Sequence, residues 1–330
     1  MAKRINLFDQ AVYDNKVSAD NKLLLEDYVM ELKSRGLSEK TIYQYSSDIK
    51  AFYCWLALNM DSKYILELKK RDFRRFFLKM NENGTSSARI NRFQSSIRNL
   101  LNFAVEDDDE YDYEINAMSS IKGMKGESVR EIVFLTNEQV DILLDHLLEN
   151  EQYQQALYVS LSYDSSARRN EILQVNKKDF LTSAFTNEVI GKRGKKFKLY
   201  YFDRTKEIAK KYFKERGDDN VESLWIVGKG KDATARSYES LYAWVVGFRK
   251  VLFEKTGEEV NLNPHSFRHS ALTNYENGTH SSLKYFGQKS LPIKVLKVLA
   301  NHTSIDTTQS YLPDKDEELL MDALGLIGGN

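Results

Sequence analysis

The sequence has little cysteine, little proline and no net charge. One cysteine, Cys54, cannot form an intramolecular disulfide, and three prolines in 330 residues leave long stretches open to helix. No apolar run approaches the roughly eighteen residues of a membrane-spanning helix, and no charged-then-apolar signal peptide opens the chain. With 42% hydrophobic and 29% charged residues, the composition predicts a soluble, mainly helical protein that works in the cytoplasm without membrane contact.

Charge is balanced overall but uneven along the chain. Basic and acidic residues both number 48, which gives no global support to nucleic-acid binding. However, residues 63–98 hold ten basic against three acidic residues, and residues 192–216 hold eleven against three. Solvated helix faces would explain either stretch, whereas basic patches in both halves favour a clamp on a DNA duplex. The candidate DNA-binding residues are Lys70, Arg71, Arg74, Arg89, Arg92 and Arg98, and in the second patch Lys195 and Lys196.

The first half has the pattern of a helical bundle. Apolar residues at helical spacing predict helices over 21–34, 38–58 and 70–80, and a fourth that begins near Ser86 or Ser87. Serine at the start of a helix can cap its first amide groups, and Ser38 is suited to this for the second helix. Residues 116–131 contain several glycines and serines and no apolar period, which predicts a linker.

The second half opens with a capping box, Thr136 followed by Gln139, and its helical pattern breaks once. Residues 188–202 flank a Gly-Lys-Arg-Gly turn, which predicts a β-hairpin. After residue 312, a proline, four acidic residues and an apolar stripe predict a tail helix. Because 330 residues exceed one usual core, we expect several parts. They are an N-terminal extension (1–19), a helical domain (20–115), the linker (116–131), a second domain (132–312) and the tail helix (313–330).

Four separated elements of the second half carry side chains suited to chemistry. Taken singly, each has an ordinary explanation, such as an exposed basic pair, a solvated turn lysine, a surface histidine and arginine, or a packed tyrosine. Their joint occurrence is harder to explain by chance. The elements are Arg168 with Glu171; Lys192; His265 with Arg268 and His269; and His302 with Tyr311 nine residues later.

Together these elements resemble the tyrosine recombinase, or phage integrase, family over about residues 20–312. The first half resembles its core-binding domain at residues 36–45 and 89–92, and in that domain the second and fourth helices approach the DNA major groove. The family's motifs are matched by Arg168, Glu171, Leu173 and Asp179 in the first box, Lys192 in the hairpin, His265, Arg268 and His269 in the second box, and Leu299, His302 and Tyr311 in the third.

Three departures from the family pattern stand out. Ser166-Ala167 replaces the common Gly-Leu before the first arginine, and a second arginine, Arg169, follows. We choose Arg168 because only this residue has the family spacing to the glutamate. Asn301 replaces a glycine, which is a mild change because Asn tolerates the left-handed conformation. Residues Thr279 to Leu291 form an insertion relative to compact members, which affects the subfamily and not the chemistry.

Phosphodiester transfer accounts for these residue types. Tyr311 would attack phosphorus in line and form a 3′-phosphotyrosine, which conserves bond energy and requires neither cofactor nor metal. Arg168 and Arg268 would stabilise charge on the non-bridging oxygens, and Lys192 would protonate the departing 5′-oxygen. The remaining expected roles are proton transfer at the tyrosine for His265, a hydrogen bond to a non-bridging oxygen for His302, and support behind the site for Glu171.

The resemblance also implies a fold and partners. The expected fold is mainly α with a small β-hairpin or sheet in the catalytic domain, arranged as a two-domain, C-shaped DNA clamp. The expected substrate is double-stranded DNA with paired recombination half-sites, on which a nucleoid-associated monomer or dimer would form a tetramer. Xer- and Cre-like recombinases and mobile-element integrases fit best, in integration and excision or in replicon resolution. A type IB topoisomerase and a non-catalytic DNA-binding accessory protein remain open alternatives.

Overall fold

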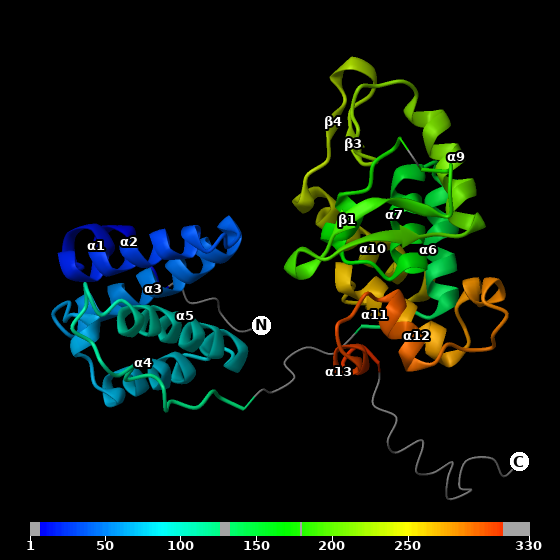
Figure 1. The fold of residues 1–330 in the computed structure, drawn as a ribbon. Helices are drawn as coiled ribbons and strands as arrows, with labels where there is room; N and C mark the ends of the chain where they lie inside the picture. The colour runs from blue at the N-terminus through cyan, green and yellow to red at the C-terminus, as the bar shows by residue number, and fades with distance from the viewer. Residues whose placement is uncertain (1–6, 126–132, 179, 313–330) are drawn as a thin grey trace, which may run out of the picture. The chain divides into compact units, whose positions relative to one another are not determined.

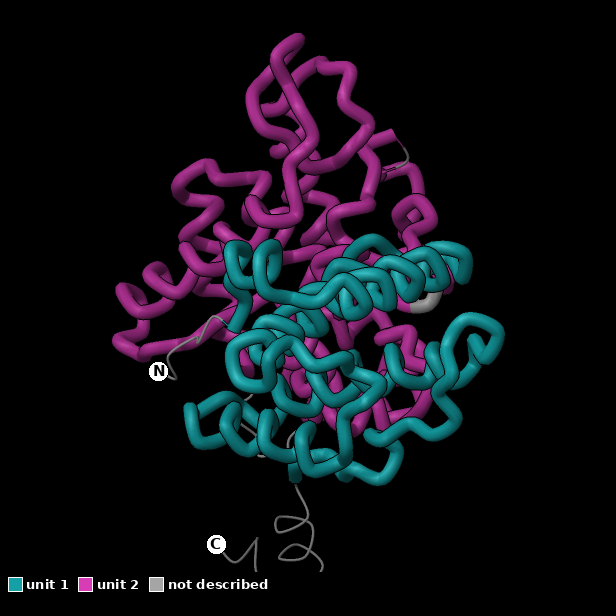
Figure 2. The backbone as a smooth tube through the Cα atoms, turned by 90° about the vertical axis from the view of Figure 1, so that its left-hand side faces the viewer, with its two compact units in different colours: residues 1–130 teal, residues 131–330 magenta. Residues whose placement is uncertain are grey.

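The chain forms two compact units, residues 1–130 and 131–330, each with its own hydrophobic core. The computed structural model describes residues 7–125, 133–178 and 180–312. Figure 1 shows the ribbon and Figure 2 the two units in separate colours. The predicted tail helix (313–330) and Asp179 of the first box lie outside the described residues. Within the described ranges, no helix is long and apolar enough to cross a membrane.

Unit 1 is a helical bundle around an aromatic core. Ser18, Ser38 and Ser86 cap three of its helices, as each side chain accepts a hydrogen bond from a backbone N–H three residues on. Phe52 and Phe76 meet edge to face in the core with ring centroids 4.8 Å apart. The helices are α1 (Gln10–Lys16), α2 (Ala19–Ser34), α3 (Glu39–Asn59), α4 (Lys70–Glu82) and α5 (Ser87–Glu106), with a 3₁₀ turn at Ile65–Glu67.

Two segments outside the expected helical domain, residues 20–115, also belong to unit 1. The N-terminal extension contains α1, which packs on α3. Residues 116–124, expected to begin the linker, pack on the core of unit 1 instead, with Met118 fully buried and Ile121 nearly so. The Asn116 amide donates to the carbonyl of Arg98 at 3.0 Å, which fixes the start of this segment. Sparse apolar residues suffice here because each of them reaches the core.

Unit 2 is built around a central helix, and its described part is mainly helical with two small two-stranded sheets, as predicted. Residues 156–165 of α7 (Tyr153–Ser165) are all buried, since α6 (Asn137–Glu149), α9 (Asp203–Arg216) and α11 (Pro264–Asn277) pack against this helix. The capping box of Thr136 and Gln139 is confirmed. The other helices are α8 (Arg169–Leu173), α10 (Tyr238–Thr256), α12 (Ile293–Leu299) and α13 (Ile305–Gln309).

The predicted hairpin is confirmed as an antiparallel pair, β1 (Phe185–Ile190) and β2 (Lys196–Tyr200), with Ile190 opposite Lys196. A 3₁₀ turn at Lys192–Gly194 joins the strands. A second short pair, β3 (Ile226–Val227) and β4 (Thr234–Ala235), lies elsewhere in unit 2.

The insertion at 279–291 folds back onto unit 2. The imidazole of His280 stacks between Tyr163 and Tyr275, with centroid distances of 4.0 and 3.7 Å. Tyr285 stacks on Phe202 at 4.6 Å, just before α9 begins. The insertion is therefore part of the packed domain rather than a loose loop.

Candidate active site

The first predicted element lies where α7 ends and α8 begins. Ser166 has a left-handed backbone with φ of 50°, which turns the chain so that Arg168 occupies the N-cap position of α8. Glu171 is buried, and its two carboxylate oxygens accept hydrogen bonds from the Arg168 backbone N–H at 2.7 Å and from Nη1 at 3.0 Å. This contact orients the guanidinium of Arg168 through one of its terminal nitrogens.

The neighbouring Arg169 points to a different environment. Its guanidinium carbon lies 3.5 Å from the ring centroid of Tyr238 and 5.2 Å from that of Tyr242, both on α10. Its Nε and Nη1 are buried with no hydrogen-bond partner in the described part of the chain. The aromatic stack therefore holds Arg169 as a packing residue, which agrees with the choice of Arg168 from spacing.

Arg268 is anchored at the centre of the site. It lies on the first turns of α11, whose start is fixed by Asn263 as N-cap and Pro264 at the first position. Its side chain is 1% exposed, and its terminal nitrogens donate to the carbonyls of Ser166 at 2.6 Å and Ala300 at 2.5 Å. Burial and nearby Arg168 lower the pKa of Arg268, yet a guanidinium stays charged at neutral pH. Two positive charges therefore lie in one partly desolvated place, which favours a bound anion.

His302 joins this network from the segment before α13. Its Nε2 accepts from Nη2 of Arg268 at 2.5 Å, and its Nδ1 lies 3.0 Å from the hydroxyl of Thr308. Because a guanidinium only donates, the hydrogen of the neutral ring is on Nδ1. Burial, with Arg268 and Arg168 nearby, lowers the pKa of His302 to about 3. A phosphate oxygen only accepts, so the expected hydrogen bond from His302 requires Nε2 to leave Arg268 and also to gain a hydrogen, by a change of tautomer or by protonation. Asn301 before it has φ of 53°, as expected.

Tyr311 follows α13 and lies against these groups. Its ring centroid is 5.1 Å from the Arg268 guanidinium carbon and 5.0 Å from the ring centroid of His302. His269, named in the motif but given no role from sequence, also contacts it. The two rings stack with centroids 4.4 Å apart, and Nδ1 of His269 is 3.1 Å from the Tyr311 carbonyl oxygen. The place of His269 in the second box, next to Arg268, was the sequence signal that could have pointed to this contact.

Lys192 and His265 border the same region. Lys192 is exposed on the hairpin turn and lines a cleft of about 210 Å³ together with Arg168, Glu171, Lys195 and His302. Gly191 before it is required, because a Cβ there would lie 2.7 Å from the Phe197 ring. His265 lies one turn before His269 on α11. Partial burial, then Arg268 and Arg168, lower the pKa of His265, so its imidazole is neutral and able to accept a proton.

The predicted DNA-binding residues fall into two groups. Arg92 and Arg98 make contacts within unit 1, although the Arg92 side chain stays 42% exposed. Arg92 forms a bidentate ion pair with buried Asp48 at 2.8 and 3.0 Å, and Arg98 donates to the carbonyl of Ile121 at 2.9 Å. Charge counting missed these buried partners, which lie 44 and 23 residues away along the chain.

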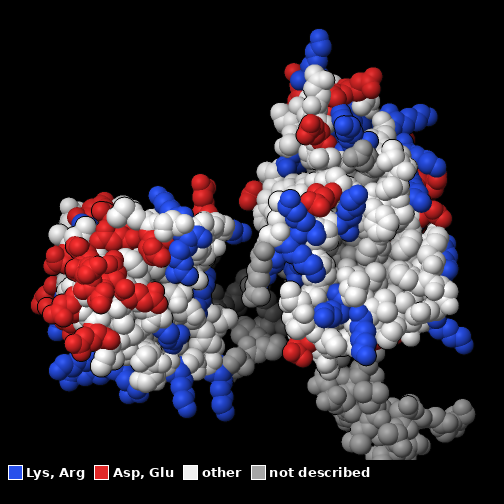
Figure 3. All heavy atoms as spheres, in the orientation of Figure 1, with Lys and Arg blue, Asp and Glu red and all other residues white. Residues whose placement is uncertain are grey.

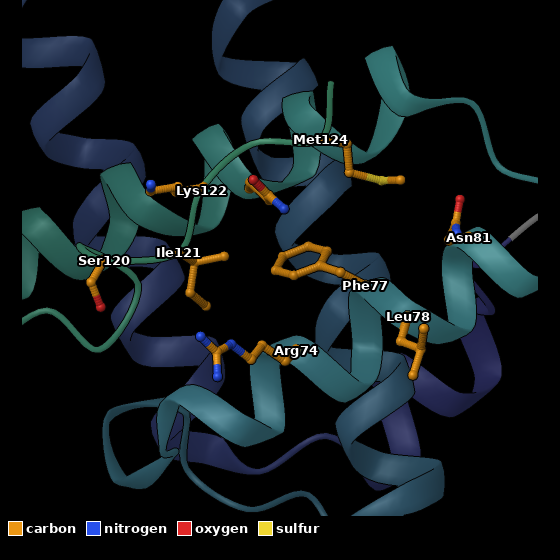
Figure 4. A pocket seen from close by; sticks show the side chains of 9 residues that line it. Arg74, Phe77, Leu78, Asn81, Ser120, Ile121, Lys122 and Met124 are labelled. Carbon is orange, nitrogen blue, oxygen red and sulfur yellow. The ribbon is translucent and has the colours of Figure 1, made fainter. Parts of the chain in front are cut away.

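The other four predicted DNA-binding residues of unit 1 lie at or near its surface. Lys70, Arg71 and Arg74 lie on α4, where Lys70 reaches the Ser120 hydroxyl at 2.6 Å and Arg71 is 3.7 Å from Asp72. Arg89 packs over the ring of Phe93 at 5.8 Å. Figure 4 shows Arg74 pointing into a hollow of unit 1 that Phe77 and Ile121 also line.

Charge is segregated on the face seen in Figure 3. Acidic side chains crowd the middle of unit 1 in this view, and basic side chains follow its lower edge. On unit 2 the hairpin residues Lys195 and Lys196 are exposed, although Lys196 lies 3.6 Å from Glu188. The acidic run at 106–114, which offsets part of the basic charge of the chain, belongs to unit 1.

Arg268, His269, His302 and Tyr311 are in contact, and Arg168, Lys192 and His265 lie nearby. This set of side chains suits an enzyme that acts on a phosphodiester. Residues 133–318 match the Phage integrase family, and residues 25–108 match the Phage integrase, N-terminal SAM-like domain. Because the first match spans more than half of the chain, the protein belongs to the phage integrase family of tyrosine recombinases. It is a tyrosine site-specific recombinase.

Relatives and solved structures agree with this assignment. The chain is 28% identical over 299 residues to tyrosine recombinase XerC of Treponema denticola, covering 86% of this chain and 92% of that protein. It is 24% identical over 320 residues to the SPbeta prophage-derived recombinase-like protein YomM of Bacillus subtilis, covering 92% and 90%.

Two solved structures show the same fold. A lambda integrase dimer bound to a COC′ core site gives a TM-score of 0.66 at 16% identity, covering 89% of this chain and 96% of that one. The Tn1549 transposon integrase in complex with a circular intermediate DNA also gives 0.66 at 16% identity, covering 91% and 99%. At these identities the likeness concerns the fold alone.

Proposed function

We propose that this recombinase cuts and rejoins DNA through a 3′-phosphotyrosine on Tyr311, in the integration or excision of a mobile element or the resolution of replicons. One observation carries the proposal. The Tyr311 ring lies 5.1 Å from the Arg268 guanidinium, in the network that includes His302, while Arg168 and Lys192 line the adjoining cleft. A nucleophile, two cations for the phosphate and a candidate acid are thus assembled by residues up to 143 positions apart in the sequence.

The proposed step balances without an outside reactant. The phenol oxygen of Tyr311 forms a bond to phosphorus as the bond from phosphorus to the 5′-oxygen breaks, and the phenolic proton passes to neutral His265. Lys192 gives a proton to the departing 5′-oxygen, which would otherwise leave as an alkoxide. Arg168 and Arg268 stabilise the extra negative charge on the phosphoryl oxygens in the transition state. Attack by another 5′-hydroxyl reverses the step and joins the strand, so no ATP is consumed.

DNA is proposed as the substrate, held by both units. Lys70, Arg71, Arg74 and Arg89 of unit 1 and Lys195 and Lys196 of unit 2 are the proposed backbone contacts, since exposed cations neutralise phosphates. Lambda integrase has been solved as a dimer on a core site and as a tetramer on a Holliday junction. By that likeness we propose that this protein binds paired half-sites and forms a tetramer on them.

A nicked duplex that carries the ends of the protein's own element tests the proposal. The nick lets the short 5′-hydroxyl strand diffuse away, so the covalent intermediate accumulates. We expect a DNA adduct on denaturing gels with wild-type protein, also in EDTA, and none with Tyr311→Phe, although that variant still shifts the duplex. An adduct in the Tyr311→Phe protein would overturn the assignment. If the wild-type protein relaxes plasmids that lack the sites as fast as plasmids that carry them, the topoisomerase alternative is favoured. If it binds the duplex without forming any adduct, an accessory role is favoured.

A further inference from the structure

His269 takes no part in the proposed step, yet it contacts the candidate nucleophile twice. Its Nδ1 lies 3.1 Å from the Tyr311 carbonyl oxygen, and its ring stacks on the phenol at a centroid distance of 4.4 Å and an angle of 29°. Phe134 packs edge-on against the same imidazole at 6.1 Å, which limits rotation of the ring. His269 is thus held in place while it touches both the backbone and the side chain of Tyr311.

The hydrogen bond defines the state of the imidazole. A carbonyl oxygen only accepts, so the hydrogen lies on Nδ1 of His269. Burial lowers the pKa of His269, which keeps the ring neutral with Nε2 bare at neutral pH. The contact therefore needs no protonation event and is complete in the resting protein.

Tyr311 needs such a contact because its own segment is short. It follows the five-residue helix α13, and its backbone N–H donates to the Thr308 carbonyl at 3.0 Å. In-line attack tolerates little misplacement, since a shift of about 1 Å can cost roughly 100-fold in rate. The helix that carries His269 also carries Arg268, so the contact ties the nucleophile to the same rigid element as the phosphate-binding arginine.

We propose that His269 is a positioning residue for the nucleophile: it holds the backbone and ring of Tyr311 in register with Arg268 through one hydrogen bond and one ring stack. This role rests on the proposed function of Tyr311. It predicts an effect on attack by the tyrosine and none on the ability of the arginines to activate the phosphate.

Three substitutions separate the two contacts. His269→Asn keeps a donor near the position of Nδ1 and loses the ring, His269→Phe keeps the ring and loses the donor, and His269→Ala loses both. From the usual worth of one hydrogen bond and one aromatic contact, we expect adduct formation on the nicked duplex to slow by about 30-fold for the alanine variant and by about fivefold for each of the others. The matched control is His146→Ala on α6, which should match wild type. Among the described residues, the ring of His146 bonds only to Asn150, the residue that caps the end of this helix.

A second measurement distinguishes positioning from a general structural effect. Hydrogen peroxide, a small external nucleophile, can attack the phosphorus in a Tyr311→Phe protein, where no tyrosine has to be placed. Adding His269→Ala to Tyr311→Phe should change this peroxide cleavage by less than about twofold. A loss there equal to the loss in adduct formation would overturn the proposal, because His269 would then act on the phosphate site.

Stability and DNA binding are measured for the same three variants. Half-site affinity should equal wild type for all three variants. Should His269→Ala fail to fold, the asparagine and phenylalanine variants decide the question by themselves. A wild-type rate of adduct formation in every folded variant would overturn the positioning role alone, whereas the absence of any adduct with wild-type protein would overturn both proposals.

Discussion

The two units of this protein use their arginines in different ways. In unit 2, Arg168 and Arg268 come together although 100 residues separate them, and they do so with His302 and Tyr311. In unit 1, Arg92 pairs with buried Asp48, and Arg98 fixes the segment at 116–124. All four are basic residues in a DNA-acting protein, and the second pair already contacts groups of its own unit.

The comparison separates two kinds of sequence argument. A spaced set of chemically different residues predicts a site, because few structures other than a site would require all of them. A run of basic residues predicts that cations are present but not that they bind DNA, since any one of them can instead form an ion pair with a buried carboxylate. The following predictions test this distinction, beginning with the largest expected effect.

The neighbouring arginines of unit 2 provide the sharpest contrast. Arg168→Ala removes a cation from the cleft and should slow adduct formation by roughly 1,000-fold, the upper range for losing one preorganised donor. Arg169→Ala removes a stack on Tyr238 and should cost about 1 kcal/mol of stability with less than about a tenfold change in rate. Single-turnover cleavage of both variants checks this. If Arg169→Ala were the more damaging to the rate, the site would be wrong by one residue.

Arg92 offers the corresponding test in unit 1. Arg92→Ala leaves the Asp48 carboxylate, which is 2% exposed, with only neutral partners among the described residues, Ser96 and Gln44. We expect a loss of about 2 to 3 kcal/mol in the free energy of unfolding, measured in urea, because the buried Asp48 carboxylate loses its cation, although the Arg92 side chain itself is 42% exposed. Arg71→Ala, whose side chain is 76% exposed, is the control and should change stability by less than about 0.5 kcal/mol. Unchanged stability of Arg92→Ala with weakened DNA binding would restore Arg92 as a DNA contact.

The insertion gives unit 2 a predicted pH dependence. Burial lowers the pKa of His280 from 6.5 to about 3, so the unfolded chain binds a proton at this residue more readily than the folded chain does. The stability from neutral His280 is complete above about pH 6.5 and is lost as pH falls from there towards about 3. His302 contributes in the same direction. Urea unfolding at pH 7 and pH 4.5 should show a smaller acid loss for His280→Phe than for wild type. An equal loss would mean that other groups dominate.

The smallest expected effect concerns a peripheral cation. Arg74→Ala should weaken half-site binding by only a few-fold, lower the slope of log affinity against log salt by about one, and leave stability unchanged. Gel shifts at several salt concentrations measure both quantities. Arg98→Ala is the contrast, since it should destabilise unit 1 and leave the slope unchanged. Equal slopes for Arg74→Ala and wild type would remove Arg74 from the DNA interface.

Local chemistry made much of the fold predictable. Ser38 and Ser86 cap their helices, Thr136 and Gln139 form the capping box, and the glycine-flanked turn closes the hairpin as expected. These features depend on neighbours within four residues or within one hairpin, so the sequence displays them directly.

Contacts between distant positions could not be predicted in the same way. His269 binds a carbonyl 42 residues later, and His280 fills a slot between tyrosines that belong to α7 and α11. Met118 and Ile121 lie in a segment that also contains glycine and serine, yet both reach the core. Such contacts have no sequence motif. Every residue has a backbone carbonyl, and a slot between two aromatic rings exists only once the chain has packed.

The most direct test of the account is a substrate in which sulfur replaces the 5′-bridging oxygen at the cleavage position. On ordinary DNA, Lys192→Ala should form the tyrosine adduct about 100-fold more slowly than wild type, as expected for loss of a general acid. A sulfur leaving group needs no proton, so the variant should then cleave at nearly the wild-type rate, while Arg168→Ala should remain slow. If sulfur restores nothing to Lys192→Ala, or restores Arg168→Ala equally, the division of roles proposed for this site is contradicted.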